Sequence, residues 1–91
     1  MIFSVVWKGS AEESLAKVWL ESSDRAKITK AARKIDQALK HDADEQGESR
    51  FSNIRILIVP PLGVYFSATA QDRLARVLHV WKFDDTPRNQ R

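Results

Sequence analysis

The stretch from residue 54 to residue 83 constrains the fold more than any other part of the sequence. Ile54–Val59, Val64–Thr69 and Leu74–Phe83 are three runs rich in branched and aromatic residues. Pro60, which cannot donate a ladder hydrogen bond, and Gly63 separate the first two runs, and a short polar turn separates the last two. The spacing predicts three consecutive strands that turn back on one another.

The N-terminal half predicts one strand followed by two helices. Ile2–Trp7 favours a strand, and Gly9 ends it. Ser10 and Glu13 have the spacing of a capping box, which predicts a helix from Ser10 to about Ser22. Ser23 is the expected N-cap of a second helix. Its apolar stripe consists of Ile28, Ala31, Ala32, Ile35, Ala38 and Leu39.

The predicted order of elements is therefore β-α-α-β-β-β, an α+β fold. Because almost nothing joins the two helices, they should form an antiparallel hairpin that covers one face of a four-stranded, antiparallel-rich sheet. The acidic segment 41–48 is expected to be a loop. A length of 91 residues predicts one domain, at residues 1–83, with a polar tail at residues 84–91. The other face of the sheet is left open.

Positive charge is concentrated in two places. Residues 25–40 hold six basic and one acidic residue, and residues 50–83 hold five basic and one acidic residue. Lys27, Lys30 and Lys34 form a stripe on the second helix. This distribution points to a polyanion or an acidic protein as partner, or to a helix face that is simply solvated.

Several functions are excluded by composition. Without cysteine there is no disulfide framework and no thiolate metal site. His41 and His79 do not have metal-ligand spacing, and neither a glycine-rich phosphate loop nor a nucleophile elbow is present. We therefore expect no metal and no cofactor. The apolar run in MIFSVVWKGS is too short for a signal peptide or a membrane span, so a cytoplasmic protein without membrane contact is expected.

Arg55 is the first candidate for a functional site. Alternation places Ile54, Ile56 and Ile58 on one side of their strand, and we expect this side to meet the helices. Arg55 would then lie in the middle of the open face, where its guanidinium can hold a phosphate through two parallel hydrogen bonds. An ion pair with an acidic side chain is the alternative. Arg50 could add a phosphate contact at the rim.

The last strand supplies the remaining candidates, but its pattern does not settle which side faces the core. Arg76 and Lys82 belong to one alternating set, and His79 and Trp81 belong to the other. On the open face, His79 would supply a titratable group and Trp81 a stacking surface. Alternatively, Trp81 belongs to the core and His79 is an ordinary strand residue.

In this order, the residues resemble the RelE/ParE superfamily of bacterial type II toxins. The resemblance covers about residues 2–83. It rests on the first strand's Val5-Val6-Trp7-Lys8 and on the block Arg55-Ile-Leu-Ile-Val59. It also includes the closing Val77-Leu-His-Val-Trp-Lys82 and a helical hairpin with Glu12, Leu15 and Trp19.

The resemblance implies a toxin, of the kind also called plasmid stabilisation proteins, that a cognate antitoxin neutralises. RelE-like members are metal-independent mRNA interferases that cut ribosome-bound mRNA, and on that pattern the candidate catalytic residues are Arg55, His79 and Lys82. The candidate RNA-binding residues are then Arg50, Arg76 and Trp81.

Two alternatives follow from the same resemblance. ParE-like members poison DNA gyrase without nuclease activity, and a third possibility is a member that only binds its antitoxin. RelE-like nucleases place lysines shortly before the core-strand arginine, whereas Gln46–Ser49 contains none. This departure favours the gyrase alternative.

Overall fold

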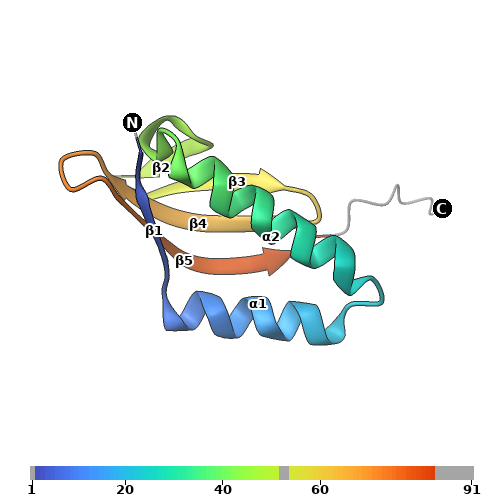
Figure 1. The fold of residues 1–91 in the computed structure, drawn as a ribbon. Helices are drawn as coiled ribbons and strands as arrows, with labels where there is room; N and C mark the ends of the chain where they lie inside the picture. The colour runs from blue at the N-terminus through green and yellow to red at the C-terminus, as the bar shows by residue number, and fades with distance from the viewer. Residues whose placement is uncertain (1, 52–53, 84–91) are drawn as a thin grey trace.

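The computed structural model describes residues 2–51 and 54–83, and the predicted tail at 84–91 lies outside the described residues (Figure 1). The fold is of the predicted α+β class. Its elements in chain order are β1 (Ser4–Trp7), α1 (Gly9–Glu21), α2 (Arg25–Lys40), the 3-10 helix η1 (Ala43–Glu45), β2 (Glu48–Phe51), β3 (Ile54–Val59), β4 (Leu62–Thr69) and β5 (Leu74–Lys82).

The sheet has five strands in the order β1-β5-β4-β3-β2. β2, β3, β4 and β5 pair antiparallel with their neighbours, which confirms the predicted meander, and β1 pairs parallel with β5. The additional strand is β2, which reads Glu-Ser-Arg-Phe. Its composition is polar because it lies at the edge of the sheet, so hydrophobic alternation gives no signal for it.

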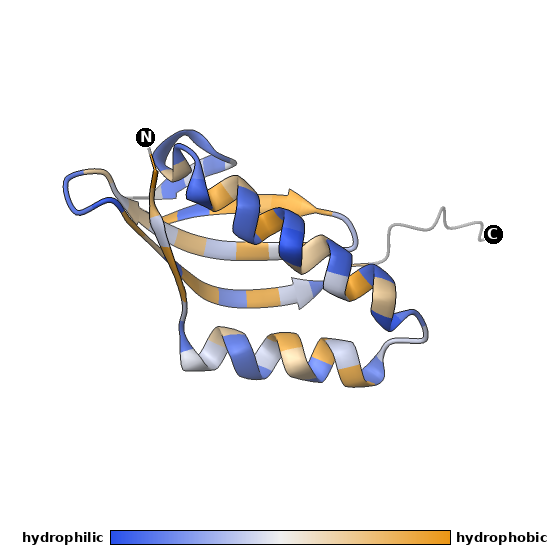
Figure 2. Ribbon diagram, viewed as in Figure 1, coloured by the Kyte–Doolittle hydropathy of each residue, from blue (hydrophilic) through white to orange (hydrophobic). Residues whose placement is uncertain are grey.

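Both helices lie on the same side of the sheet, with α2 across β3 and β4 and α1 alongside β5 (Figure 1). β4 and α2 supply most of the core. The fully buried large side chains are Phe66, Ile28, Ile35, Leu39, Leu62, Val64, Val77 and Val80. Hydrophilic residues follow the outward side of α2, whereas β3 is hydrophobic along nearly its whole length (Figure 2). No helix in the described part of the chain is long and apolar enough to cross a membrane.

Both helix starts differ from the prediction. α1 begins at Gly9 with Lys8 as N-cap, so the capping box predicted at Ser10 is wrong. α2 is capped by Asp24 rather than Ser23, because the Asp24 carboxylate accepts a hydrogen bond from the Lys27 amide at 3.1 Å. A carboxylate at this position also interacts favourably with the positive end of the helix dipole.

The hydroxyl of Ser10 forms a hydrogen bond with β5 instead of capping α1. β1 pairs with only the first half of β5. The last backbone hydrogen bond between the β1 segment and β5 runs from the Lys8 amide to the Val77 carbonyl at 3.0 Å. Beyond that point, Ser10 Oγ donates to the Leu78 carbonyl at 3.0 Å, and Ser14 Oγ accepts from the Val80 amide at 3.3 Å. α1 therefore satisfies backbone groups that a strand edge would otherwise leave open.

Replacing Ser14 with Ala should cost about 1 kcal/mol of unfolding free energy, because the half-buried Val80 amide loses its acceptor. We expect faster hydrogen exchange at Val80 and a lower denaturation midpoint. Ser23→Ala is the matched control, since the structure places the α2 cap at Asp24. An equal loss in Ser23→Ala would contradict the observed cap.

The turns between the last three strands also differ in detail from the expectation. Pro60 and Pro61 make the first turn alone, and Gly63 already lies within β4. The second turn is closed as predicted, with the Arg73 amide donating to the Ala70 carbonyl at 3.1 Å. Gly63 is therefore a strand residue and does not form part of the turn.

Candidate functional site

β3 faces the opposite way from the prediction. Arg55 lies opposite Phe66, which is buried under the helices, and Leu57 and Val59 follow on the same side. The isoleucines therefore occupy the open face, and the predicted orientation of this strand is wrong. The sequence could not reveal this, because both sides of β3 carry bulky apolar residues and alternation has no contrast.

Arg55 is engaged on the helix side of the sheet. Its Nε donates to the Gln46 carbonyl at 2.7 Å, and its Nη2 donates to the Gly47 carbonyl at 3.2 Å. These contacts tie β3 to the segment that connects η1 with β2. The guanidinium binds two backbone carbonyls here. It does not lie on the open face, where a phosphate contact was expected.

Replacing Arg55 with Ala should lower the unfolding free energy by about 2 kcal/mol, because hydrogen bonds from a charged donor to two carbonyls are lost. Thermal denaturation measures the loss. Arg55→Lys should recover only part of it, since an ammonium lacks the planar fork. Loss of biological activity in Arg55→Ala at unchanged stability would instead support the catalytic role expected from sequence.

A bulge in β5 determines which side of this strand is open. Tyr65 pairs with His79 but the next residue, Phe66, pairs with Val77, so Leu78 is an additional residue in β5. As a result, Val77 and Val80 both face the core although their spacing is odd. The bulge therefore divides each of the two alternating sets predicted from the sequence between the two faces of the sheet.

The bulge brings three predicted site residues together and separates others. Arg76, His79 and Trp81 share the open face, since their partners across β4 are Ser67, Tyr65 and Gly63. Lys82 pairs with the buried Leu62 and lies at the helix side of the strand end. Thus His79 does not share a face with Arg55 or Lys82, with which it was grouped as catalytic.

An aromatic cluster lies on the open side of β4 and β5, and its members are Tyr65, His79 and Trp81. The Tyr65 and Trp81 ring centroids are 5.0 Å apart, and His79 lies 6.5 Å from Tyr65 and 6.4 Å from Trp81. A side chain on Gly63 would lie 2.4 Å from Trp81 Cζ2, so glycine here lets the indole lie on the strand. Tyr65 could not be identified from the sequence, because only the strand register reveals that it lies opposite His79.

The open face as a whole is apolar with few charges. We define it as the sheet side away from the helices, formed by Val6, Ile54, Ile56, Ile58, Tyr65, Arg76, His79 and Trp81. Ile58 on β3 is 47% exposed and Val6 on β1 is 44% exposed, so large apolar side chains are open to solvent on both sides of the β4–β5 pair. Arg50 lies at the β2 edge and pairs with Glu48 at 3.8 Å. Such a surface is suited to apolar and stacking contacts.

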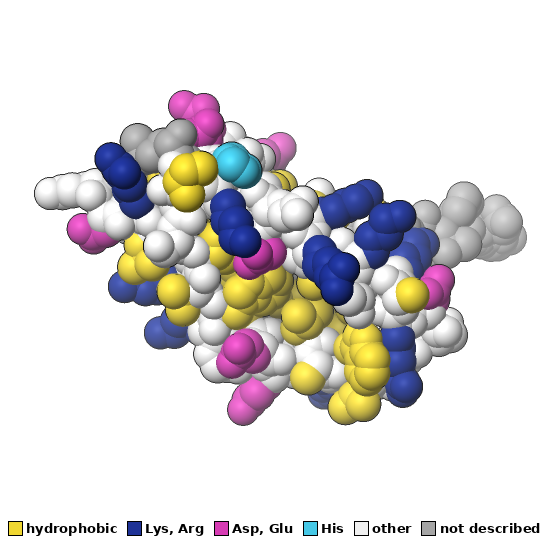
Figure 3. Space-filling model, viewed as in Figure 1, with side chains coloured by type: hydrophobic (Ala, Val, Ile, Leu, Met, Phe, Trp, Pro, Cys, Tyr) yellow, Lys and Arg dark blue, Asp and Glu magenta, His cyan; other side chains and the backbone are white. Residues whose placement is uncertain are grey.

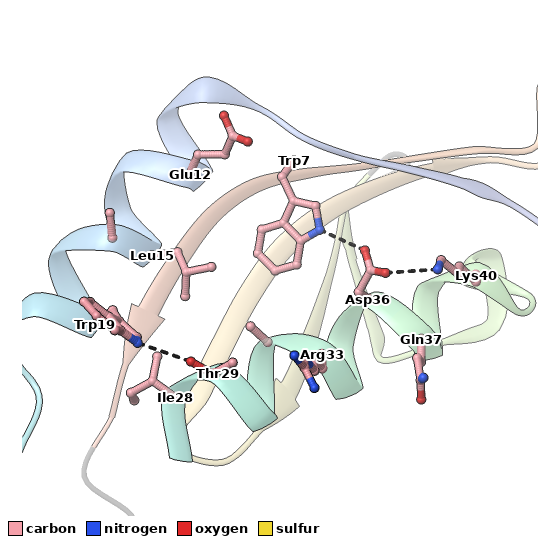
Figure 4. A pocket seen from close by; sticks show the side chains of 12 residues that line it. Trp7, Glu12, Leu15, Trp19, Ile28, Thr29, Arg33, Asp36, Gln37 and Lys40 are labelled. Carbon is pink, nitrogen blue, oxygen red and sulfur yellow. Dashed lines mark hydrogen bonds and ion pairs between the residues drawn. The ribbon is translucent and has the colours of Figure 1, made fainter. Parts of the chain in front are cut away.

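A second candidate surface lies between the two helices, which we call the helix groove. It has a volume of about 590 Å³, and apolar side chains of β1, α1 and α2 line it between the helices (Figures 3 and 4). Its apolar lining comprises Trp7, Leu15, Ala16, Trp19, Ile28 and Ala32. Polar side chains border it: Glu12, Thr29, Arg33, Asp36, Gln37 and Lys40.

Hydrogen bonds hold both indoles of the groove in place (Figure 4). Trp7 Nε1 donates to Asp36 Oδ1 at 3.1 Å, and Lys40 Nζ lies 3.4 Å from the other carboxylate oxygen. Trp19 Nε1 donates to Thr29 Oγ1 at 3.2 Å. The guanidinium of Arg25 lies 4.6 Å from the Trp19 ring centroid and forms a cation–π contact with it. The groove is thus preformed around two oriented tryptophans.

Comparison by sequence finds nothing: no protein-family model and no curated protein matches the chain. Comparison by structure finds clear matches. The toxin–antitoxin complex RelBE2 of Mycobacterium tuberculosis contains a chain that superposes with a TM-score of 0.75 at 11% identity, covering 93% of this chain and 95% of that one.

Two further matches come from other organisms. A chain of the chromosomal ParDE toxin–antitoxin system of P. aeruginosa gives a TM-score of 0.66 at 18% identity, covering 91% of this chain and 98% of that one. The isolated E. coli RelE toxin gives 0.61 at 12% identity, covering 94% and 88%. With strand order, helix placement and these superpositions in agreement, the chain has the fold of the RelE/ParE toxin superfamily.

Proposed function

We propose that this chain is the toxin of a type II toxin–antitoxin pair and that it uses its two surfaces for different partners. The open face binds the target, and the helix groove receives the cognate antitoxin. The observation that carries the proposal is the superposition on a chain of the RelBE2 toxin–antitoxin complex over 93% of this chain. The two unpartnered apolar surfaces support it, because each offers what a protein interface needs.

The distribution of cations supports a toxin that acts by binding. Charge stabilisation in phosphodiester cleavage needs several cations that converge on one phosphate. Arg55 and Lys82 lie on the helix side, and Arg50 pairs with Glu48. On the open face of the described chain, Arg76 accompanies an aromatic cluster to which His79 itself belongs. DNA gyrase, the target that the sequence resemblance suggests for ParE-like members, is the first target to test.

Ribosome-dependent cleavage of mRNA is the second candidate. It is favoured by one specific arrangement, in which Arg76, His79 and Trp81 share a face. An arginine can bind a phosphate, an imidazole can transfer a proton, and an indole can stack on a base. In this version His79 is the catalytic residue, and Arg55 has a structural role.

The helix groove supports an antitoxin segment of defined chemistry. Its floor is apolar and holds two oriented indoles, whereas its rim carries Glu12, Arg33 and Lys40. An amphipathic helix fits such a groove by placing apolar anchors at helical spacing on the floor. Tryptophans at the centre of an interface commonly contribute most of its binding energy.

The experiment is inducible expression of the chain in bacteria, alone and together with the protein encoded next to it. We expect growth arrest by the chain alone and recovery when the neighbour is present. A DNA supercoiling assay and primer extension on mRNA then separate the two candidates. Normal growth on expression of the folded chain would contradict a toxin role.

A further inference from the structure

The helix α2 carries a lysine stripe, Lys27, Lys30 and Lys34, that neither surface above uses. None of the three residues lines the helix groove, although other residues of α2 do. Lys30 and Lys34 are exposed on the outer side of the helix, away from its buried apolar stripe. Basic side chains gather over this part of the molecule in the space-filling view (Figure 3).

Lys30 and Lys34, the two residues on which the argument rests, have no acidic neighbours along α2 that would neutralise them. Helix residues three and four positions apart are neighbours on the surface. The neighbours of Lys30 are Ala26, Lys27, Arg33 and Lys34, and the acidic Asp36 instead faces the groove, where it binds Trp7 and Lys40. Within the described chain, Lys30 and Lys34 form no ion pair. Like charges at this spacing destabilise a helix, so solubility alone would be better served by mixed signs.

We propose that the lysine stripe binds the phosphate backbone of double-stranded DNA. This inference goes beyond the proposed function and does not depend on it. DNA presents a dense, regular line of negative charge, and lysines bind it as point charges without regard to base sequence. The three lysines lie outside the lining of the helix groove, so DNA bound to the stripe does not have to occupy the groove.

Other occupants fit the stripe less well. A membrane surface requires an apolar helix face that can insert, whereas Ile28, Ile35 and Leu39 are at most 1% exposed and belong to the core. Single-stranded nucleic acid is bound through aromatic stacking, and the stripe carries no aromatic residue. Duplex RNA is recognised through its 2′-hydroxyl groups by polar side chains beside the cations, and the stripe offers lysines alone.

Fluorescence anisotropy with a short random-sequence DNA duplex tests the proposal on the purified chain. Affinity is measured between about 50 and about 200 mM salt for wild type and for the double variant Lys30→Gln, Lys34→Gln. Removing two phosphate contacts should lower the slope of log affinity against log salt by about 1.8 and weaken binding at least tenfold at low salt. Circular dichroism verifies that the variant folds.

The matched control removes the same charge elsewhere. Lys8 and Lys17 are exposed and lie outside both the stripe and the helix groove. Lys8→Gln, Lys17→Gln should keep nearly the wild-type slope. Equal losses in both double variants would overturn the proposal in favour of unspecific attraction by net charge. It is also overturned if the wild type does not bind the duplex, or binds a matched RNA duplex or single strand more tightly.

Growth arrest is measured separately, so the two ideas can fail independently. The proposal predicts that Lys30→Gln, Lys34→Gln loses DNA binding whether or not the chain arrests growth. A chain that binds DNA through the stripe but does not arrest growth would refute the toxin role alone.

Discussion

Replacing Trp81 with Ala is expected to abolish growth arrest while the protein stays folded. Trp81 is half-buried and packs against Tyr65 at a centroid distance of 5.0 Å, on the open face near the end of β5. Tryptophans that dominate an interface contribute about 2 kcal/mol or more, which corresponds to a loss of at least about thirtyfold in affinity for the target. Viable counts after induction measure the effect, and antitoxin binding by the purified variant should be unchanged.

Trp19→Ala is the matched control on the opposite side of the molecule. Trp19 lines the helix groove and is 38% exposed, so its removal should leave growth arrest intact but weaken rescue by the antitoxin. The two variants should therefore show opposite phenotypes. If Trp81→Ala arrests growth as wild type does, or if Trp19→Ala is the variant that becomes harmless, the assignment of the two surfaces is wrong.

Replacing Gly47 with Ala should cause the largest loss of stability among the substitutions considered. Gly47 has φ = 67°, where an L side chain is strained, and its added Cβ would lie 2.0 Å from the Ile56 carbonyl oxygen. The left-handed conformation costs about 1–2 kcal/mol, and the backbone contact forces β3 or the preceding loop to move. We expect a total of about 3 kcal/mol or more, which lowers Tm by roughly 12 °C or more.

Gly9→Ala provides the internal control. Gly9 opens α1, and an added Cβ would meet nothing within 4 Å. Alanine there should be neutral or stabilise the protein by up to about 1 kcal/mol through the reduced entropy of the unfolded chain. Similar Tm values for the two variants would show that the close approach at Gly47 does not constrain the loop.

The sequence predicted the class of the fold, the helical hairpin and the three-strand meander, because these depend on period and turn residues that are local. The polar β2 was missed, since an edge strand does not need apolar alternation. The cap of α1 was misplaced because Ser10 binds the Leu78 carbonyl, a contact across 68 positions that no local pattern contains.

The candidate site was harder to predict for two physical reasons. β3 is apolar on both sides, so its facing was decided by packing, and Arg55 turned to the carbonyls of Gln46 and Gly47. In β5 one additional residue, Leu78, exchanged the sides halfway along the strand. Strict alternation across a bulge assigns every later residue to the wrong face. Trp81 and His79 nonetheless lie on the open face, which is one of the two orientations that the sequence left undecided.

Primer extension on mRNA isolated from cells that the chain has arrested distinguishes a toxin that acts by binding from a ribonuclease. We expect intact mRNA, because Arg55 and Lys82 do not reach the face that carries His79 and the described open face lacks converging cations. Cuts that appear on induction and disappear with His79→Ala would contradict this expectation and establish the chain as a ribonuclease.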